Sequence, residues 1–199
     1  IKDHPILFPV VTIIIMEVFI SKMRKLKGIR KMILIEEAWK AIAKEGMAEY
    51  IKYLFKTVRK FYGEAIVVTQ EVEDIISSPI VKQAIINNSD CKILLDQSKY
   101  QNKFDQIQEL LGLTEKEKAL VLSINKGNDP SRKYKEVFIS LGGMVSKVYA
   151  TEVSLEEYLA YTTEESEKIK VQAYAKKWGG DIRKGIAELA NDLRLGKVA

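Results

Sequence analysis

Two adjacent carboxylates that follow an apolar run are the residues of this sequence best placed to do chemistry. Residues 32–35 contain no polar side chain, which predicts a strand buried on both faces, as in a parallel sheet. Glu36 and Glu37 come next, and residues 38–44 favour a helix. Ligands of open α/β sheets bind beyond the carboxyl ends of the strands, where these acids would lie. Glu36 can hold the water shell of a Mg²⁺ ion, and Glu37 can orient or deprotonate a water that attacks a γ-phosphate. Alternatively, the two acids simply begin the helix, because its N-terminal end favours negative charge.

A second apolar run ends in a polar amide. Residues 66–68 are followed by Thr69 and Gln70, so a second strand is expected there. If the two strands are neighbours, Gln70 lies beside Glu37. A neutral amide at this position can contact the γ-phosphate or its attacking water without adding charge repulsion. The alternative is that Gln70 only begins the loop at residues 71–74.

A basic helix precedes this second strand. Residues 47–62 carry apolar side chains at helical spacing, with Lys52, Lys56, Arg59 and Lys60 on the opposite face. Such a face is usually only solvated. In ring-forming ATPases, however, an arginine of one subunit often completes the neighbour's site and stabilises the charge of the transferring phosphoryl group. Arg59 is the candidate for this role because it lies just ahead of the strand.

The strand, acidic pair and helix have the layout of a Walker B segment. Together with Ala38-Trp39 and the apolar-Thr69-Gln70 run, they resemble the VirB4-type ATPases of type IV secretion, in particular the TraG-type conjugation ATPases of conjugative transposons. The resemblance covers roughly residues 6–150. It implies a RecA-like P-loop NTPase core with ATP and Mg²⁺ as cofactors. Such proteins form rings, often hexamers, with other secretion components, on the cytoplasmic face of the bacterial inner membrane, which they can contact peripherally. At Glu36 this family usually has Asp, and the longer side chain alters how a Mg²⁺-bound water would be held.

The phosphate-binding half of such a core is absent from the sequence. A P-loop requires Gly-x4-Gly-Lys-Ser/Thr, whose backbone amides cradle phosphates. Gly180 and Gly185 have the right separation, but Ile186 and Ala187 follow them. We therefore interpret the chain, which opens in mid-pattern, as the C-terminal half of a motor domain. Without the other half, we expect it to bind nucleotide weakly and to hydrolyse ATP at a negligible rate.

The composition of the 199 residues excludes several other chemistries. Cys91 is the only cysteine, so no intramolecular disulfide can form, and its apolar surroundings favour a buried packing role. His4 is the only histidine, so Cys/His metal sites and Ser-His catalysis have little support. The formal net charge of +5 permits contact with nucleic acid or an anionic membrane but requires neither.

The apolar residues 5–20 are too few for a membrane span and contain Glu17. They predict a buried helix that continues to Leu26 and ends at Gly28. Its last turns are basic. These cations either only stabilise a solvated helix end, where positive charge is favourable, or form a patch that binds nucleic acid. The residues concerned are Lys22, Arg24, Lys25, Lys27, Arg30 and Lys31.

The remaining pattern completes an α/β fold, a partial RecA-like core with a mostly parallel sheet. A third strand is expected at residues 92–96, and helices at 102–111 and 115–123, the second with a Thr114/Glu117 capping box. Gly142-Gly143 predicts a β-hairpin at the sheet edge. Residues 1–153 would form the core, and residues 154–199 a helical appendage divided at Gly179-Gly180.

Two functions remain open. The first is the C-terminal part of an ATPase that powers conjugative DNA transfer or type IV secretion assembly. The second is a non-catalytic module of a secretion complex that binds a protein partner, or DNA through residues 22–31.

Overall fold

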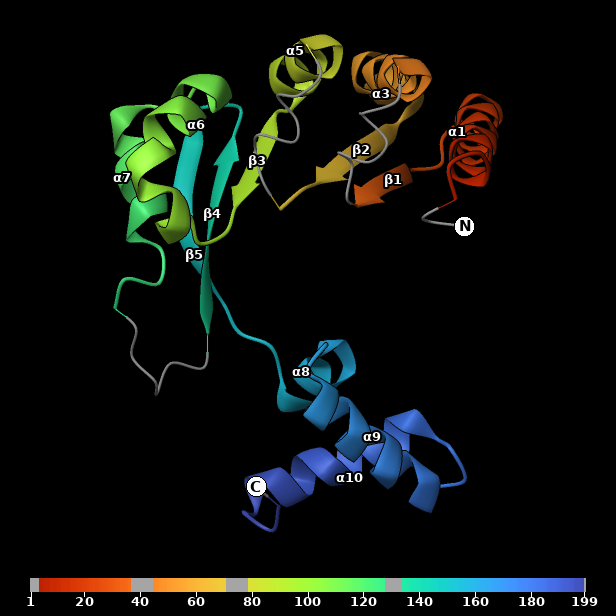
Figure 1. Ribbon diagram of the computed structural model, residues 1–199, viewed down its shortest axis with the longest axis vertical. Helices are drawn as coiled ribbons and strands as arrows, with labels where there is room; N and C mark the ends of the chain where they lie inside the picture. The colour runs from red at the N-terminus through yellow and green to blue at the C-terminus, as the bar shows by residue number, and fades with distance from the viewer. Residues whose placement is uncertain (1–3, 37–44, 71–78, 128–133, 199) are drawn as a thin grey trace. The chain divides into compact units, whose positions relative to one another are not determined.

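The computed structural model describes residues 4–36, 45–70, 79–127 and 134–198 (Figure 1). In chain order, the elements up to β3 are α1 (Leu7–Lys25), β1 (Lys31–Glu36), α3 (Glu45–Thr57), the 3-10 helix η1 (Val58–Phe61), β2 (Gly63–Val68), α5 (Pro79–Asn88) and β3 (Cys91–Leu94). They are followed by η2 (Ser98–Lys103), α6 (Phe104–Leu111), α7 (Glu115–Ser123), β4 (Lys135–Leu141), β5 (Val145–Thr151), α8 (Leu155–Tyr161), α9 (Glu165–Lys177) and α10 (Ile182–Arg194). The chain divides into two compact units, residues 1–124 with 138–148, and residues 125–137 with 149–199.

Strands β1 and β2 pair in parallel, as the sequence predicted. The register runs from Lys31 opposite Gly63 to Glu36 opposite Val68. Apolar residues of α1, α3 and α5 form a core against one face of this pair. Three strand residues, Ile33, Ile35 and Val67, pack against that core.

The other face of β1 is exposed, so the prediction that both faces are buried is wrong for the described chain. Met32 is 60% and Leu34 56% exposed, because successive side chains of a strand point to opposite faces. No described residue covers the face that carries Met32 and Leu34 as a core would. An apolar sheet face of this kind is normally packed against another layer.

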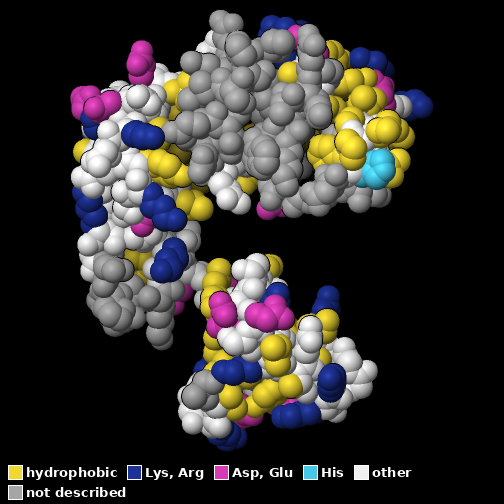
Figure 2. All heavy atoms as spheres, in the orientation of Figure 1, with side chains coloured by type: hydrophobic (Ala, Val, Ile, Leu, Met, Phe, Trp, Pro, Cys, Tyr) yellow, Lys and Arg dark blue, Asp and Glu magenta, His cyan; other side chains and the backbone are white. Residues whose placement is uncertain are grey.

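The predicted helix at residues 5–26 is confirmed as α1, and Gly28 follows it with a φ of +73°. It buries only one stripe, Met16, Ile20 and Met23, and not the whole helix as the sequence suggested. Its solvent side is apolar, and Figure 2 shows hydrophobic side chains gathered on the part of the surface that α1 forms. Within the described residues, no helix is both long and apolar enough to cross a membrane.

The hairpin predicted at Gly142-Gly143 is confirmed, with both glycines at positive φ. Its predicted place at the edge of the parallel sheet is wrong for the described residues, because the hairpin and β3 form a sheet of their own. The order of this sheet is β3-β4-β5, β3 and β4 are antiparallel, and no hydrogen bond pairs it with β1–β2 in the described residues. The buried packing role expected for Cys91 is wrong, because this residue begins the short strand β3 and is exposed.

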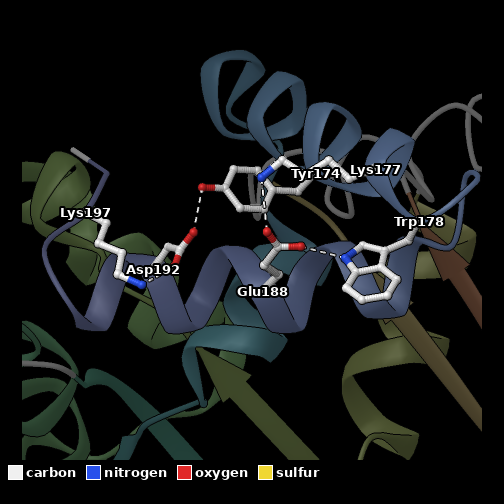
Figure 3. A network of polar contacts seen from close by, with 6 residues as sticks. All are labelled: Tyr174, Lys177, Trp178, Glu188, Asp192 and Lys197. Atoms are coloured by element: carbon white, nitrogen blue, oxygen red, sulfur yellow. Dashed lines mark hydrogen bonds and ion pairs between the residues drawn. The ribbon is translucent and has the colours of Figure 1, made fainter.

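The C-terminal helices α8, α9 and α10 surround a small core of their own. The residues of this core are Leu159, Val171, Ile186, Leu189 and Ala190. Polar contacts between α9 and α10 border it (Figure 3): Tyr174 donates to Asp192, and Lys177 and Trp178 donate to Glu188. The division of this region at Gly179-Gly180 is confirmed.

Candidate functional site

The parallel pairing brings Glu36 and Gln70 to the same edge of the β1–β2 layer. Glu36 is the last residue of β1 and lies opposite Val68, and Gln70 follows two residues later. Both side chains are exposed, and neither makes a hydrogen bond or ion pair with another described residue. Glu37, the predicted general base, lies outside the described residues. The carboxyl edge of the pair thus holds a carboxylate and an amide that have no partner among the described residues.

Glu36 also lies on the uncovered face of the sheet. Its side chain is on the same face as those of Met32 and Leu34, which are exposed, while Ile33 and Ile35 face the core. A group bound beyond the strand ends could therefore reach this carboxylate without displacing a packed side chain of the described residues.

Arg59 lies at the opposite edge. It belongs to η1, which ends just before β2 begins, so the length of β2, about 17 Å at 3.3 Å per residue, separates it from Gln70. Its Nη1 is 4.0 Å from Asp90 Oδ2, and both side chains are largely exposed, at 90% and 82%. The structure therefore does not bring Arg59 together with Glu36 and Gln70 in one chain. Any contact of Arg59 with a nucleotide at the carboxyl edge must come from a neighbouring subunit.

The carboxylate at the end of β1 is chemically suited to a magnesium ion held by phosphates and water. Mg²⁺ keeps several waters in such sites and takes only one or two carboxylates from the protein. Glu36 is free to accept hydrogen bonds from such waters. No group of three His, Cys, Asp or Glu residues that could bind a metal directly occurs in the described residues.

Gly185, the second glycine of the rejected P-loop spacing, has a packing role instead. A Cβ at this position would lie 2.6 Å from the backbone nitrogen of Ala175. Only glycine therefore allows α10 to approach α9 this closely. The spacing of Gly180 and Gly185 reflects a helix contact and not phosphate binding.

A buried carboxylate, Glu117, was predicted only as part of a capping box. That box is confirmed, since Thr114 and Glu117 exchange side-chain and backbone hydrogen bonds. In addition, Ser140 and Ser146 of the hairpin donate to Glu117 Oε1, at 3.0 and 2.5 Å. Burial raises the pKa of Glu117, but the hydrogen bonds from Ser146, Thr114 and Ser140 outweigh it and lower the pKa to about 2. The pattern T-x-x-E gave the cap, whereas nothing in the sequence indicated the two serines.

The parallel strand pair with its helices is an α/β layer, and ligands of such layers bind beyond the carboxyl ends of the strands. The model of the TraG P-loop domain matches residues 1–193, so the chain belongs to this family of P-loop ATPases. The match includes α8–α10, beyond the region in which the sequence resemblance was recognised.

One solved structure that is similar to this chain is VirB4 of Thermoanaerobacter pseudethanolicus. The two share 19% identity with a TM-score of 0.48, over 78% of this chain and 37% of VirB4. The chain thus spans well under half the length of that protein. No curated protein sequence matches it.

Proposed function

We propose that this chain is the C-terminal part of a motor ATPase that hydrolyses ATP in a conjugation or type IV secretion machine. The observation that carries the proposal is the shared edge of Glu36 and Gln70, which are unpaired within the described residues at the carboxyl end of a parallel strand pair. Membership of a P-loop family supports a nucleoside triphosphate as the substrate. The same family context supports a ring, often a hexamer, at the cytoplasmic face of the inner membrane.

In this proposal a P-loop segment elsewhere in the polypeptide covers the exposed face of β1 and binds the phosphates. The exposure of Met32 and Leu34 supports this, because both faces of a complete parallel sheet are normally covered by helices, which would bury these side chains. ATP with Mg²⁺ supplies the electrophilic γ-phosphorus when it is bound. This chain then contributes the groups around it.

Each residue has a separate task. Glu37 accepts the proton of the water that attacks the γ-phosphorus while the bond to the ADP leaving group breaks, and Glu36 would hold water molecules of a bound Mg²⁺ ion. Gln70 donates its amide N–H to a γ-phosphate oxygen or holds the attacking water. Arg59 of a neighbouring subunit stabilises the charge that develops on the transferred phosphoryl group.

The test is Glu37→Gln in a protein that includes the P-loop segment. The amide keeps the size of the side chain but cannot accept the proton, so turnover should fall about 10²- to 10⁴-fold. Nucleotide binding should stay within about twofold, measured by equilibrium binding of a fluorescent ATP analogue, because the ground-state contacts remain. Glu109→Gln, an exposed acid of α6, is the matched control. Unchanged turnover in Glu37→Gln would reject the assignment and favour a non-catalytic interaction module.

A further inference from the structure

The amino edge of the β1–β2 layer gathers basic side chains from two segments that are far apart in the sequence. One segment is the end of α1 with the loop after it, and the other is the end of α3 with η1. All the cations concerned are exposed. We call the following residues the basic edge: Lys22, Lys25, Lys27, Arg30, Lys56, Arg59 and Lys60.

Lys31 joins the two segments. Its Nζ donates to the carbonyl oxygens of Leu26 at 2.5 Å and Met23 at 3.3 Å, at the end of α1, and to that of Phe61 at 2.8 Å, at the end of η1. One ammonium group thus satisfies carbonyls that both helix ends would otherwise leave unpaired. As a result, the two basic segments are held side by side.

The positive charge of the basic edge is only partly balanced. Glu64 pairs with Arg30 at 2.5 Å, and Asp90 approaches Arg59 at 4.0 Å. The side chains of the five lysines make no hydrogen bond or ion pair with any residue that the structure describes. A surface with this excess of exposed positive charge attracts a polyanion, because each phosphate contact releases condensed counterions.

An exposed aromatic ring lies at the same edge. Tyr62 directly follows η1, is 58% exposed, and its carbonyl accepts a hydrogen bond from the backbone N–H of Lys31. Its φ of 57° places it in the left-handed region, which is uncommon for a bulky residue. An exposed ring among cations is the arrangement on which unpaired bases stack.

We propose that the basic edge and Tyr62 form a binding surface for single-stranded nucleic acid. The lysines contact phosphates, and the Tyr62 ring stacks on a base. In a duplex the bases are already stacked on each other, so the aromatic contact favours a single strand. This surface lies at the edge opposite Glu36 and Gln70, and the proposal does not depend on ATP hydrolysis. Arg59 belongs to both proposals and is therefore left unchanged in the tests below.

The first experiment measures how the 199-residue chain binds a fluorescein-labelled oligothymidylate of about 20 nucleotides, by fluorescence anisotropy. Between about 50 and 200 mM KCl, five phosphate contacts should weaken binding about 100-fold. Lys25→Gln/Lys27→Gln and Lys56→Gln/Lys60→Gln should each weaken it about tenfold and flatten the salt dependence. Lys116→Gln/Lys176→Gln removes the same charge from exposed lysines elsewhere and should leave binding within about twofold. Equal losses in all three double variants, or no binding by the unmodified chain, would overturn the proposal.

The second experiment tests the ring. Tyr62→Gly removes it and also relieves the left-handed backbone, so a loss of binding could not be attributed to a loss of folding. We expect about tenfold weaker binding of the oligonucleotide by Tyr62→Gly, and binding within about twofold by Tyr62→Phe, which keeps the ring. A Tyr62→Gly variant that binds normally, together with equal affinity for a duplex of the same length, contradicts the single-strand preference.

A third measurement separates nucleic acid from an anionic membrane surface. The same lysine variants are sedimented with vesicles of phosphatidylglycerol and phosphatidylcholine. If the lysine substitutions release the protein from vesicles but leave oligonucleotide binding unchanged, the basic edge contacts lipid and the proposal is wrong.

Discussion

The acidic side chains at the carboxyl edge of β1–β2 and those in the C-terminal half of the chain differ in their exposure and in their hydrogen bonds. Glu36 is exposed and unpaired within the described residues. Glu117, in contrast, is buried and accepts hydrogen bonds from Thr114, Ser140 and Ser146. Glu188 likewise accepts hydrogen bonds from the side chains of Lys177 and Trp178 (Figure 3). Glu117 and Glu188 thus have partners that stabilise the fold, whereas Glu36, to which we propose a metal role, has none among the described residues.

The same contrast holds for apolar surface. The core of α8–α10 buries Leu189 completely, and the glycine at position 185 brings two helices into close contact. In β1, by comparison, Leu34 is left 56% exposed. The helical region thus buries a core of its own, whereas the β1–β2 layer has an apolar face that another layer could cover.

The largest expected effect concerns Glu117. Its folded-state pKa of about 2 lies below the ordinary value of 4.5, so the ionised form stabilises the fold. This contribution, about 3 kcal/mol, should be fully present above pH 4.5 and be lost as the pH falls from there towards 2. Glu117→Gln should lower the free energy of unfolding by about 2–3 kcal/mol at pH 7 and remove this part of the acid dependence. Urea denaturation followed by circular dichroism at several pH values measures both quantities.

Glu109→Gln is the control for Glu117→Gln, because Glu109 is an exposed acid of α6 with no described side-chain partner. It should change stability by less than about 0.5 kcal/mol. Equal effects of the two substitutions would mean that Glu117 is not held by the hairpin serines in solution.

The next effect concerns the contact between α9 and α10. In Gly185→Ala the added methyl would lie 2.6 Å from the Ala175 nitrogen, so the helices must separate. We expect a loss of about 2 kcal/mol, even though alanine is the better helix former. Asn191→Ala, at an exposed position of the same helix, should stay within about 0.5 kcal/mol. Thermal unfolding followed by circular dichroism compares the two variants, and a more stable Gly185→Ala would show that the helices do not touch here.

Local patterns predicted much of this fold because their physical causes are local. The Thr114/Glu117 box, the Gly142-Gly143 hairpin and the helix break at Gly179-Gly180 depend on residues a few positions apart. The parallel pairing of β1, which ends in Glu36, with β2, which Gln70 follows, was predicted from their apolar runs and the family resemblance.

The errors have non-local causes. Cys91 has apolar neighbours in sequence, but its exposure depends on where β3 lies in its sheet. The burial of β1 depends on which layers cover it, and an apolar run cannot report whether they are present. The link that Lys31 makes between α1 and η1 likewise joins residues that no short pattern relates.

The smallest expected effect is that of Leu34→Ala, which is compared with Ile33→Ala to test whether one face of β1 is uncovered. Ile33 packs against the core of α1, α3 and α5, so Ile33→Ala should cost the 199-residue chain about 2 kcal/mol. Leu34 points to the other face, and Leu34→Ala should cost less than about 0.5 kcal/mol. In a protein that includes the P-loop segment, the cost of Leu34→Ala should rise to about that of Ile33→Ala, because the proposed layer would bury Leu34. Urea denaturation of both variants in both proteins makes the comparison. If Leu34→Ala stays neutral in the longer protein, the P-loop segment does not cover this face, and the carboxyl edge that holds Glu36 must be completed in another way.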